Sequence, residues 1–168
     1  VHFTDQIMNL FGFDSIKSVF CKMVNVKTED VEDYFFLVYD LKNGMHVQME
    51  IGTWVLNPLP RWMILGDLGT AYINDFSRNG KIIKIEKSAE HSEAVVTGEG
   101  TPTRTFAPRP ADEVMTFELP DTPTDLREYY ANLRDAIEGK CEPIVKPSQV
   151  CAVMHVLDCA FESARTGK

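Results

Sequence analysis

The apolar residues near the start of the chain recur at steps of three and four positions, which is the period of a helix with one buried face. They are Phe3, Ile7, Leu10 and Phe11. Gly12 follows them, and glycine commonly ends a helix because it adopts the left-handed backbone conformation without strain. The pattern therefore predicts a short amphipathic helix with His2 at its entrance.

The same period returns near the end of the chain and predicts two further helices. We expect the first to be capped by Thr122, to begin with Pro123 and to end at Gly139. Its predicted apolar face consists of Leu126, Tyr129, Tyr130, Leu133, Ala136 and Ile137. The second helix is expected to begin near Pro147 and to stop by Gly167. Its predicted buried residues are Val150, Val153, Met154, Leu157, Ala160, Phe161 and Ala164.

A β-hairpin is the clearest local signal between these helices. Residues 33–41 and 45–53 flank Asn43-Gly44, the dipeptide best suited to the positive backbone angles of a two-residue type I′ turn. Such a turn fixes the register of the two strands. The cross-strand pairs that it predicts are Lys42 with Met45, Leu41 with His46, Tyr39 with Gln48, Val38 with Met49, Leu37 with Glu50, and Phe36 with Ile51.

This register would give the hairpin two unlike faces. The first is almost purely apolar and consists of Phe36, Val38, Val47, Met49 and Ile51. The second combines Phe35, Leu37, Tyr39 and Leu41 with His46, Gln48 and Glu50. We expect helices to cover the first face and a second subunit to cover the mixed face. On this interpretation, Leu37→Glu would weaken self-association with little loss of folded structure.

The remaining apolar runs predict an α+β domain. Residues 16–24 favour a strand, although a helix also fits their pattern, and more strands are expected at 61–65, 70–74, 81–87, 94–97 and 114–119. Residues 98–110 are poor in apolar side chains and predict an exposed loop. A helix, a run of strands and two more helices indicate a largely antiparallel sheet with helices packed on one face.

Composition narrows the classes of function. With 168 residues, of which 44% are hydrophobic, the chain is long enough for one compact domain. A net charge of −8 with scattered basic residues argues against nucleic acid, whose phosphates are bound through clustered Lys and Arg. No run approaches the roughly 18 apolar residues of a membrane helix, and no signal-peptide pattern opens the chain. We therefore expect a cytoplasmic protein that binds neither nucleic acid nor membranes.

The four cysteines match neither a zinc-ligand spacing nor a disulfide scaffold. They are Cys21, Cys141, Cys151 and Cys159. We expect reduced thiols. Cys151 and Cys159 lie eight residues apart in a predicted helix and are interpreted as small core residues.

Other polar and aromatic residues invite functional interpretations that the pattern does not favour. His46, Gln48 and Glu50 alternate along one predicted strand, but no second group of ligands accompanies them, so no metal site is predicted. Trp54 and Trp62 could stack on a sugar ring, although packing is the favoured interpretation.

Four stretches of sequence occur in a distinctive order. The chain opens with V-H-F-T-D-Q, continues with R-W-M-I-L-G-D-L-G-T at residues 61–70, and closes with N-L-R-D-A-I-E-G at 132–139 and E-S-A-R-T-G-K at 162–168. Together they resemble the second domain of the glucose-fructose oxidoreductase and inositol dehydrogenase family, where a D-x-G-x-H-x-x-D-Q pattern opens a helix that carries the catalytic His. The resemblance covers nearly the whole chain.

The resemblance implies that residues 1–168 are a single C-terminal, substrate-side domain of an NAD- or NADP-dependent sugar or polyol oxidoreductase. Its open, mostly antiparallel sheet would carry helices on one face and leave the other face free to build dimers or tetramers. The family's dinucleotide-binding domain, with its Gly-rich fingerprint and its catalytic Lys, would lie before Val1. The isolated chain is therefore expected to be inactive and to hold no cofactor.

The resemblance also implies roles for two residues. His2 takes the position of the His that acts with an upstream Lys and Asp to remove a substrate hydroxyl proton while a hydride passes to the nicotinamide. An imidazole suits this task because it takes up and releases a proton near neutral pH. Asp5 follows one helical turn later, where it would orient His2 or meet a substrate hydroxyl, or would simply complement the helix dipole.

A second class of function stays open, because a fold alone does not establish chemistry. The alternative is a stand-alone carbohydrate-binding or assembly module without hydride chemistry. On sequence alone, a single His at a helix entrance more often has a structural role, and the family resemblance is what favours the enzyme.

Overall fold

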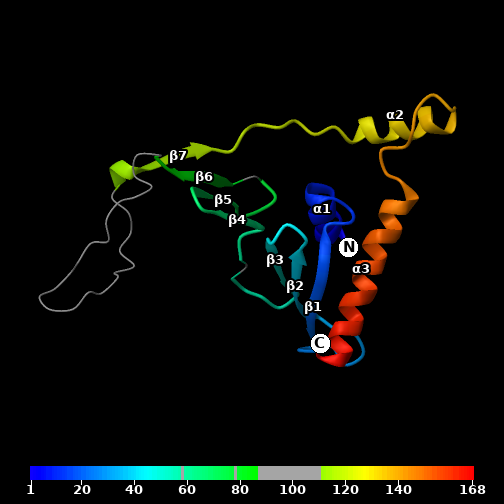
Figure 1. The fold of residues 1–168 in the computed structure, drawn as a ribbon, viewed down its shortest axis with the longest axis horizontal. Helices are drawn as coiled ribbons and strands as arrows, with labels where there is room; N and C mark the ends of the chain where they lie inside the picture. The colour runs from blue at the N-terminus through cyan, green and yellow to red at the C-terminus, as the bar shows by residue number, and fades with distance from the viewer. Residues whose placement is uncertain (58, 78, 87–110) are drawn as a thin grey trace, which may run out of the picture. The chain divides into compact units, whose positions relative to one another are not determined.

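The computed structural model describes residues 1–57, 59–77, 79–86 and 111–168 (Figure 1). The described helices are α1 (His2–Phe11), α2 (Leu126–Ile137) and α3 (Pro147–Thr166), with a short 3-10 helix, η2, at Ala111–Glu113. The described strands are β1 (Ile16–Val24), β2 (Tyr34–Leu41), β3 (His46–Gly52), β4 (Trp62–Gly66), β5 (Gly69–Ile73), β6 (Gly80–Ile85) and β7 (Val114–Glu118). The predicted α+β class is confirmed. The strand expected at 94–97 and the loop expected at 98–110 lie outside the described residues.

The antiparallel strands form two sheets, which belong to two compact units. One unit comprises Val1–Val55 with Thr124–Lys168 and contains the sheet of order β1-β2-β3. The other comprises Leu56–Pro123 and contains the sheet of order β4-β5-β6-β7. Every strand pair in both sheets is antiparallel, as expected.

The β2–β3 hairpin has a register one residue away from the predicted one. Leu37 lies opposite Met49 and Val38 opposite Gln48. The Leu41 backbone N–H donates to the Met45 carbonyl at 2.8 Å, so the loop contains three residues, and its last, Gly44, has φ 87°. Asn-Gly fits this three-residue loop as well as the two-residue one, because both place glycine at a positive φ. A slip of one residue moves every side chain of one strand to the other sheet face, and here that strand is β2.

On β2 the core side is therefore the one that was assigned to a second subunit, whereas Val47 and Met49 of β3 keep their expected core side. Leu37, Tyr39 and Leu41 are 3%, 0% and 2% exposed. Their cross-strand neighbours include Val47 and Met49, so this face is apolar on both strands. The expectation that Leu37 lies in a subunit contact, and that Leu37→Glu would leave the fold intact, is wrong.

Helices α1 and α3 cover this face (Figure 1). The Thr4 hydroxyl of α1 shares a buried hydrogen bond of 3.0 Å with the Tyr39 hydroxyl of β2. The Cys21 backbone N–H of β1 donates to the Ser163 hydroxyl of α3 at 2.9 Å. Each helix is thus attached to the sheet by a hydrogen bond that is itself buried, where an unmade bond would be costly.

The buried sides of these helices differ in detail from the predicted ones. In α1, Ile7 and Met8 are buried, whereas Leu10 is 60% exposed. In α3 the buried residues are Val153, Val156, Ala160 and Ser163. Val150, Met154 and Phe161 were expected in the core but are exposed. The sheet meets the side of α3 that carries small residues, because small side chains allow closer approach.

Helix α2 begins later than predicted and buries none of its residues. Its N-cap is Asp125 rather than Thr122, because the Asp125 carboxylate accepts a hydrogen bond of 2.9 Å from the Arg127 backbone N–H. The predicted apolar face is present on this helix. No described element of its own unit covers it.

The four-stranded sheet depends on glycine where its strands come close. A Cβ at Gly69 would lie 2.3 Å from the Ile83 carbonyl oxygen. A Cβ at Gly80 would lie 1.9 Å from the Tyr72 carbonyl oxygen. Both distances are shorter than any tolerable contact. The absence of a side chain is therefore a packing requirement of this sheet.

A carboxylate organises the loop between β1 and β2. Asp33 is buried, and its two oxygens accept hydrogen bonds from the backbone N–H groups of Val26, Lys27 and Thr28 at 2.7, 2.8 and 3.2 Å. The bond from Val26 is the largest of the effects that lower the pKa of Asp33, because such bonds favour the charged form. The loop is folded around this anion.

We predict that Leu37→Glu abolishes cooperative folding, whereas Val38→Glu remains folded. Leu37 faces the core, where an unpaired carboxylate has no compensating partner, while the neighbouring Val38 points to the opposite face. Circular dichroism with urea unfolding measures both variants. If the Leu37→Glu variant folded and the Val38→Glu variant did not, the result would indicate the two-residue turn and contradict the observed register.

We predict that Asp33→Asn lowers the melting temperature at neutral pH and that the difference from the parent chain disappears in acid. The folded-state pKa of Asp33 lies below the unfolded value of about 3.9. Its stabilising effect is therefore fully present above that value and is lost as the pH falls through the folded-state pKa. Thermal unfolding at neutral and acidic pH checks this, with the exposed Asp30→Asn of the same loop as control. An equal difference at both pH values would show that the charge is not responsible.

Candidate functional site

The two residues that the sequence singled out lie together in the first turn of α1. His2 is the first helical residue and Asp5 follows three residues later, so both project from the same side of the helix. Both are exposed. Thr4, Ile7 and Met8, which alternate with them along α1, are buried against the core.

The first turn of α1 has no side-chain cap. Val1 is the N-cap and offers no side-chain oxygen, and the Asp5 backbone N–H donates to the Val1 carbonyl at 2.9 Å. The other backbone N–H groups of a first turn have no partner within their own helix. Asp5 supplies the negative charge that this end of a helix dipole favours.

The His2 imidazole and the Asp5 carboxylate face solvent, while the Thr4–Tyr39 hydrogen bond attaches the helix to the sheet. Within the described residues no hydrogen bond joins the His2 side chain to that of Asp5, so the two groups are free to face a common ligand. A proton acceptor beside a hydrogen-bond acceptor can hold and deprotonate an alcohol. The roles of His2 and Asp5 stay predictions.

The polar row on β3 lies on the outer side of its sheet. His46, Gln48 and Glu50 are exposed there. The Tyr34 hydroxyl donates to Glu50 at 2.8 Å, and this bond to a carboxylate raises the pKa of Tyr34. The described part of the chain contains no group of three or more His, Cys, Asp or Glu side chains placed to hold a metal ion.

The two tryptophans have different surroundings. The Trp54 ring lies 5.9 Å from the Tyr34 ring and is partly exposed. Trp62 begins β4 and is half-buried. In the same unit as Trp62, the Arg61 guanidinium lies 3.9 Å from the centre of the Phe76 ring.

The G-x-x-G stretch joins two strands and is not a phosphate loop. Gly66 ends β4, Gly69 begins β5, and the two glycines lie opposite each other across the hairpin. A phosphate-binding loop requires a following helix N-terminus, which no part of this hairpin supplies.

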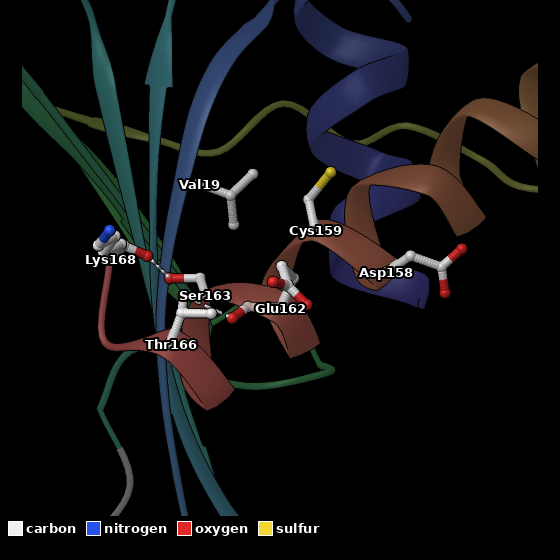
Figure 2. Close-up of a pocket in the computed structure, with 7 residues that line it drawn as sticks. All are labelled: Val19, Asp158, Cys159, Glu162, Ser163, Thr166 and Lys168. Atoms are coloured by element: carbon white, nitrogen blue, oxygen red, sulfur yellow. Dashed lines mark hydrogen bonds between the residues drawn. The ribbon is translucent and has the colours of Figure 1, made fainter.

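A surface hollow of about 510 Å³ lies beside the last turns of α3 (Figure 2). The residues that line it are Val19, Asp158, Cys159, Glu162, Ser163, Thr166 and Lys168. Its carboxylates at positions 158 and 162 share one side of the helix, a spacing that is visible in the sequence but that sequence reasoning did not single out. The Ser163 hydroxyl is already engaged, since it accepts from Cys21 and donates to the Lys168 carbonyl. The hollow is a surface groove at the end of a helix, and we assign no chemistry to it.

The cysteines are free thiols with unequal surroundings. Burial raises the pKa of Cys21, which keeps that thiol protonated and unreactive. Cys159 is half-buried and lies 3.9 Å from a ring nitrogen of His155. Cys151 is exposed, so its interpretation as a core residue is wrong.

Comparison with known proteins assigns the whole chain to one family. A family model described as "Oxidoreductase family, C-terminal alpha/beta domain" matches residues 1–168. No curated protein matches the chain significantly. Within the residues that the structure describes, no helix has both the length and the apolar character needed to cross a membrane.

The chain is similar to several solved structures. An NAD-binding protein from Listeria innocua is 33% identical, with a TM-score of 0.85 and coverage of 99% of this chain and 48% of that one. The WlbA dehydrogenase from Bordetella pertussis, solved with NADH and UDP-GlcNAcA, is 19% identical with a TM-score of 0.63 and coverage of 99% and 41%. The UDP-N-acetylglucosamine 3-dehydrogenase GnnA from Acidithiobacillus ferrooxidans is 19% identical with a TM-score of 0.63 and coverage of 98% and 45%. The chain thus spans about half the length of the structures that it matches.

Proposed function

Because the chain belongs to the glucose-fructose oxidoreductase and inositol dehydrogenase (Gfo/Idh/MocA) family and corresponds to its C-terminal domain, we propose that residues 1–168 form the substrate-side domain of an NAD- or NADP-dependent sugar or polyol oxidoreductase. The match of the family model over the entire chain carries this proposal. The parent enzyme would contain a separate dinucleotide-binding domain. Residues 1–168 alone would be inactive.

Two relatives support a sugar-type substrate. WlbA was solved with a sugar nucleotide, and GnnA is named for its action on one. At 19% identity their likeness to this chain concerns the fold, so the substrate class is part of the proposal. We propose a sugar or polyol hydroxyl as the group that reacts.

The described residues do not fit a dinucleotide. The G-x-x-G stretch is a strand turn, and none of the three described α-helices follows a glycine-rich loop of the kind that binds pyrophosphate. NAD or NADP would therefore be held by the other domain of the parent enzyme. The contribution of this chain would be to bind the substrate and to exchange its proton.

We propose that His2 accepts the proton of the reacting hydroxyl. Its position at the exposed first turn of α1 leaves the imidazole accessible, while Thr4 and Tyr39 hold the helix in place. Asp5 would accept a hydrogen bond from a second hydroxyl of the same substrate. The carboxylate would thereby fix which hydroxyl meets His2.

We predict that His2→Gln lowers kcat of the parent enzyme by about 100- to 10,000-fold, the usual contribution of a general base, with a smaller change in KM. Glutamine keeps a hydrogen-bonding side chain but cannot take up a proton. Steady-state reduction of NAD(P) measures the effect, and Gln6→Ala on the same helix is the control.

If kcat fell by less than about tenfold, the result would show that His2 does not take part in the proton-transfer step. Sugar binding that depends on neither the cofactor nor His2 would favour the alternative, a non-catalytic carbohydrate-binding or assembly module. Calorimetry on the parent protein and on His2→Gln distinguishes the two.

We further propose that the protein self-associates through the outer face of the β1-β2-β3 sheet. The apolar residues of this outer sheet face are Phe20, Val24, Phe36 and Val38. Phe20 is 44% exposed and Val24 is 37% exposed. Gln48 and Glu50 border this group on β3, and Lys22 lies within it on β1. Subunit interfaces commonly combine apolar and polar residues in this way.

We predict that Val38→Glu converts the parent protein to a smaller assembly without unfolding it. The added carboxylate would stand at the centre of the outer sheet face, beside Phe20 on the neighbouring strand. Light scattering coupled to size exclusion measures the mass, and Asn9→Glu on α1 adds the same charge elsewhere as control. An unchanged mass for the folded Val38→Glu protein would exclude this face as the interface.

A further inference from the structure

Helix α2 carries an apolar stripe that no described element of its own unit covers. The members of this α2 stripe, spaced three or four residues apart, are Leu126, Tyr129, Tyr130, Leu133 and Ile137. Their exposed fractions are 81%, 43%, 66%, 40% and 78%. The two other described α-helices each bury some of their apolar residues, whereas α2 buries none.

The contacts of α2 attach it to its own following loop rather than to the sheet. The Asn132 side chain donates to the Glu142 carbonyl at 3.2 Å and accepts from the Ile144 backbone N–H at 2.8 Å. The Tyr129 and Tyr130 rings meet edge to face with centres 5.3 Å apart. Helix and loop therefore form one local structure that presents the stripe outward.

A helix of this length needs a partner to persist. It has 12 residues, and isolated helices shorter than roughly 12–15 residues are marginal in water. Its Asp125 cap and the Arg127–Asp125 ion pair, 2.7 Å long, support the first turn. They add little free energy, because exposed ion pairs are weak. This helix lacks the stabilisation that a partner packed against its apolar stripe would give.

We propose that the α2 stripe docks onto the dinucleotide-binding domain of the parent enzyme. This inference rests on the proposed function, because it requires that domain to be present. The relatives support the occupant: the Listeria innocua protein matches 99% of this chain, yet the match spans 48% of its own length. In that protein, about as many residues lie outside the matched part as within it.

The size of the stripe favours a covalently attached partner over a second copy. A helix of 12 residues offers a strip about 18 Å long and about 10 Å wide. Stable association between separate proteins needs about 800 Å² on each partner, which such a strip does not provide. A domain on the same polypeptide has a high effective concentration, so a small contact suffices. Tyrosine and leucine also suit a contact that is partly hydrated at its edges.

Hydrogen exchange of residues 126–137 in the full-length parent protein tests the proposal. We expect slow exchange in the parent and about tenfold or faster exchange in Tyr130→Glu, because a carboxylate within the contact opens it. Leu133→Gln is a milder second variant that should act in the same direction. Ala131→Glu adds the same charge on the opposite side of α2 and should leave exchange unchanged.

Each other outcome overturns the proposal. Unchanged protection in both stripe variants shows that α2 does not depend on the stripe. Equal protection in residues 1–168 alone shows that α2 needs no second domain. Faster exchange accompanied by a fall in mass on light scattering assigns the stripe to a second copy.

Binding of NADH to the parent protein, followed by nicotinamide fluorescence, separately tests the proposed function. Absence of NADH binding refutes that function. NADH binding with unchanged hydrogen exchange refutes only the docking of α2.

Discussion

The buried face of β2 is the constraint on which the rest of the first unit depends. Tyr39 has no exposed surface, and its hydroxyl is held by Thr4 of α1. Burial raises the pKa of Tyr39, which keeps the phenol neutral in the core. A buried hydroxyl without a partner would be costly, so this hydrogen bond, together with the buried Ile7 and Met8, keeps one side of α1 against the core. His2 and Asp5 lie on the opposite, exposed side of the helix.

The limit of sequence reasoning is clearest at the hairpin. The two strands and their Asn-Gly turn could be predicted, because their residue types favour this conformation over the alternatives. The register could not, since both a two-residue loop and a three-residue loop place Gly44 at a positive φ. One residue of slip exchanged the core side and the outer side of β2, while β3 kept its expected sides. Leu37, taken as a surface residue, is a core residue, and Val38 takes its place outside.

Helix prediction had a similar limit. The spacing of apolar residues predicted all three described α-helices, because that spacing is an intrinsic property of the chain. Which side is covered depends on neighbours that lie far away in sequence. Ser163 is buried because it meets the Cys21 backbone N–H, a pairing that no local pattern contains. Met154 and Phe161 are exposed for the complementary reason: the strand meets the side of α3 that carries the smaller residues.

The candidate site was predictable as a pair of positions but not as a working centre. The motif around His2 and Asp5 identified them, and their spacing put them on one side of a helix. None of the described α-helices follows a glycine-rich loop, and the described residues contain no cluster of three or more possible metal ligands. The anchoring side chains of α1 and the exposed ones alternate along a single turn. Stability and the proposed chemistry would therefore be carried by different residues of the same helix. Replacing His2 would leave the Thr4–Tyr39 bond intact, so a loss of activity in that variant would report on the site rather than on the fold.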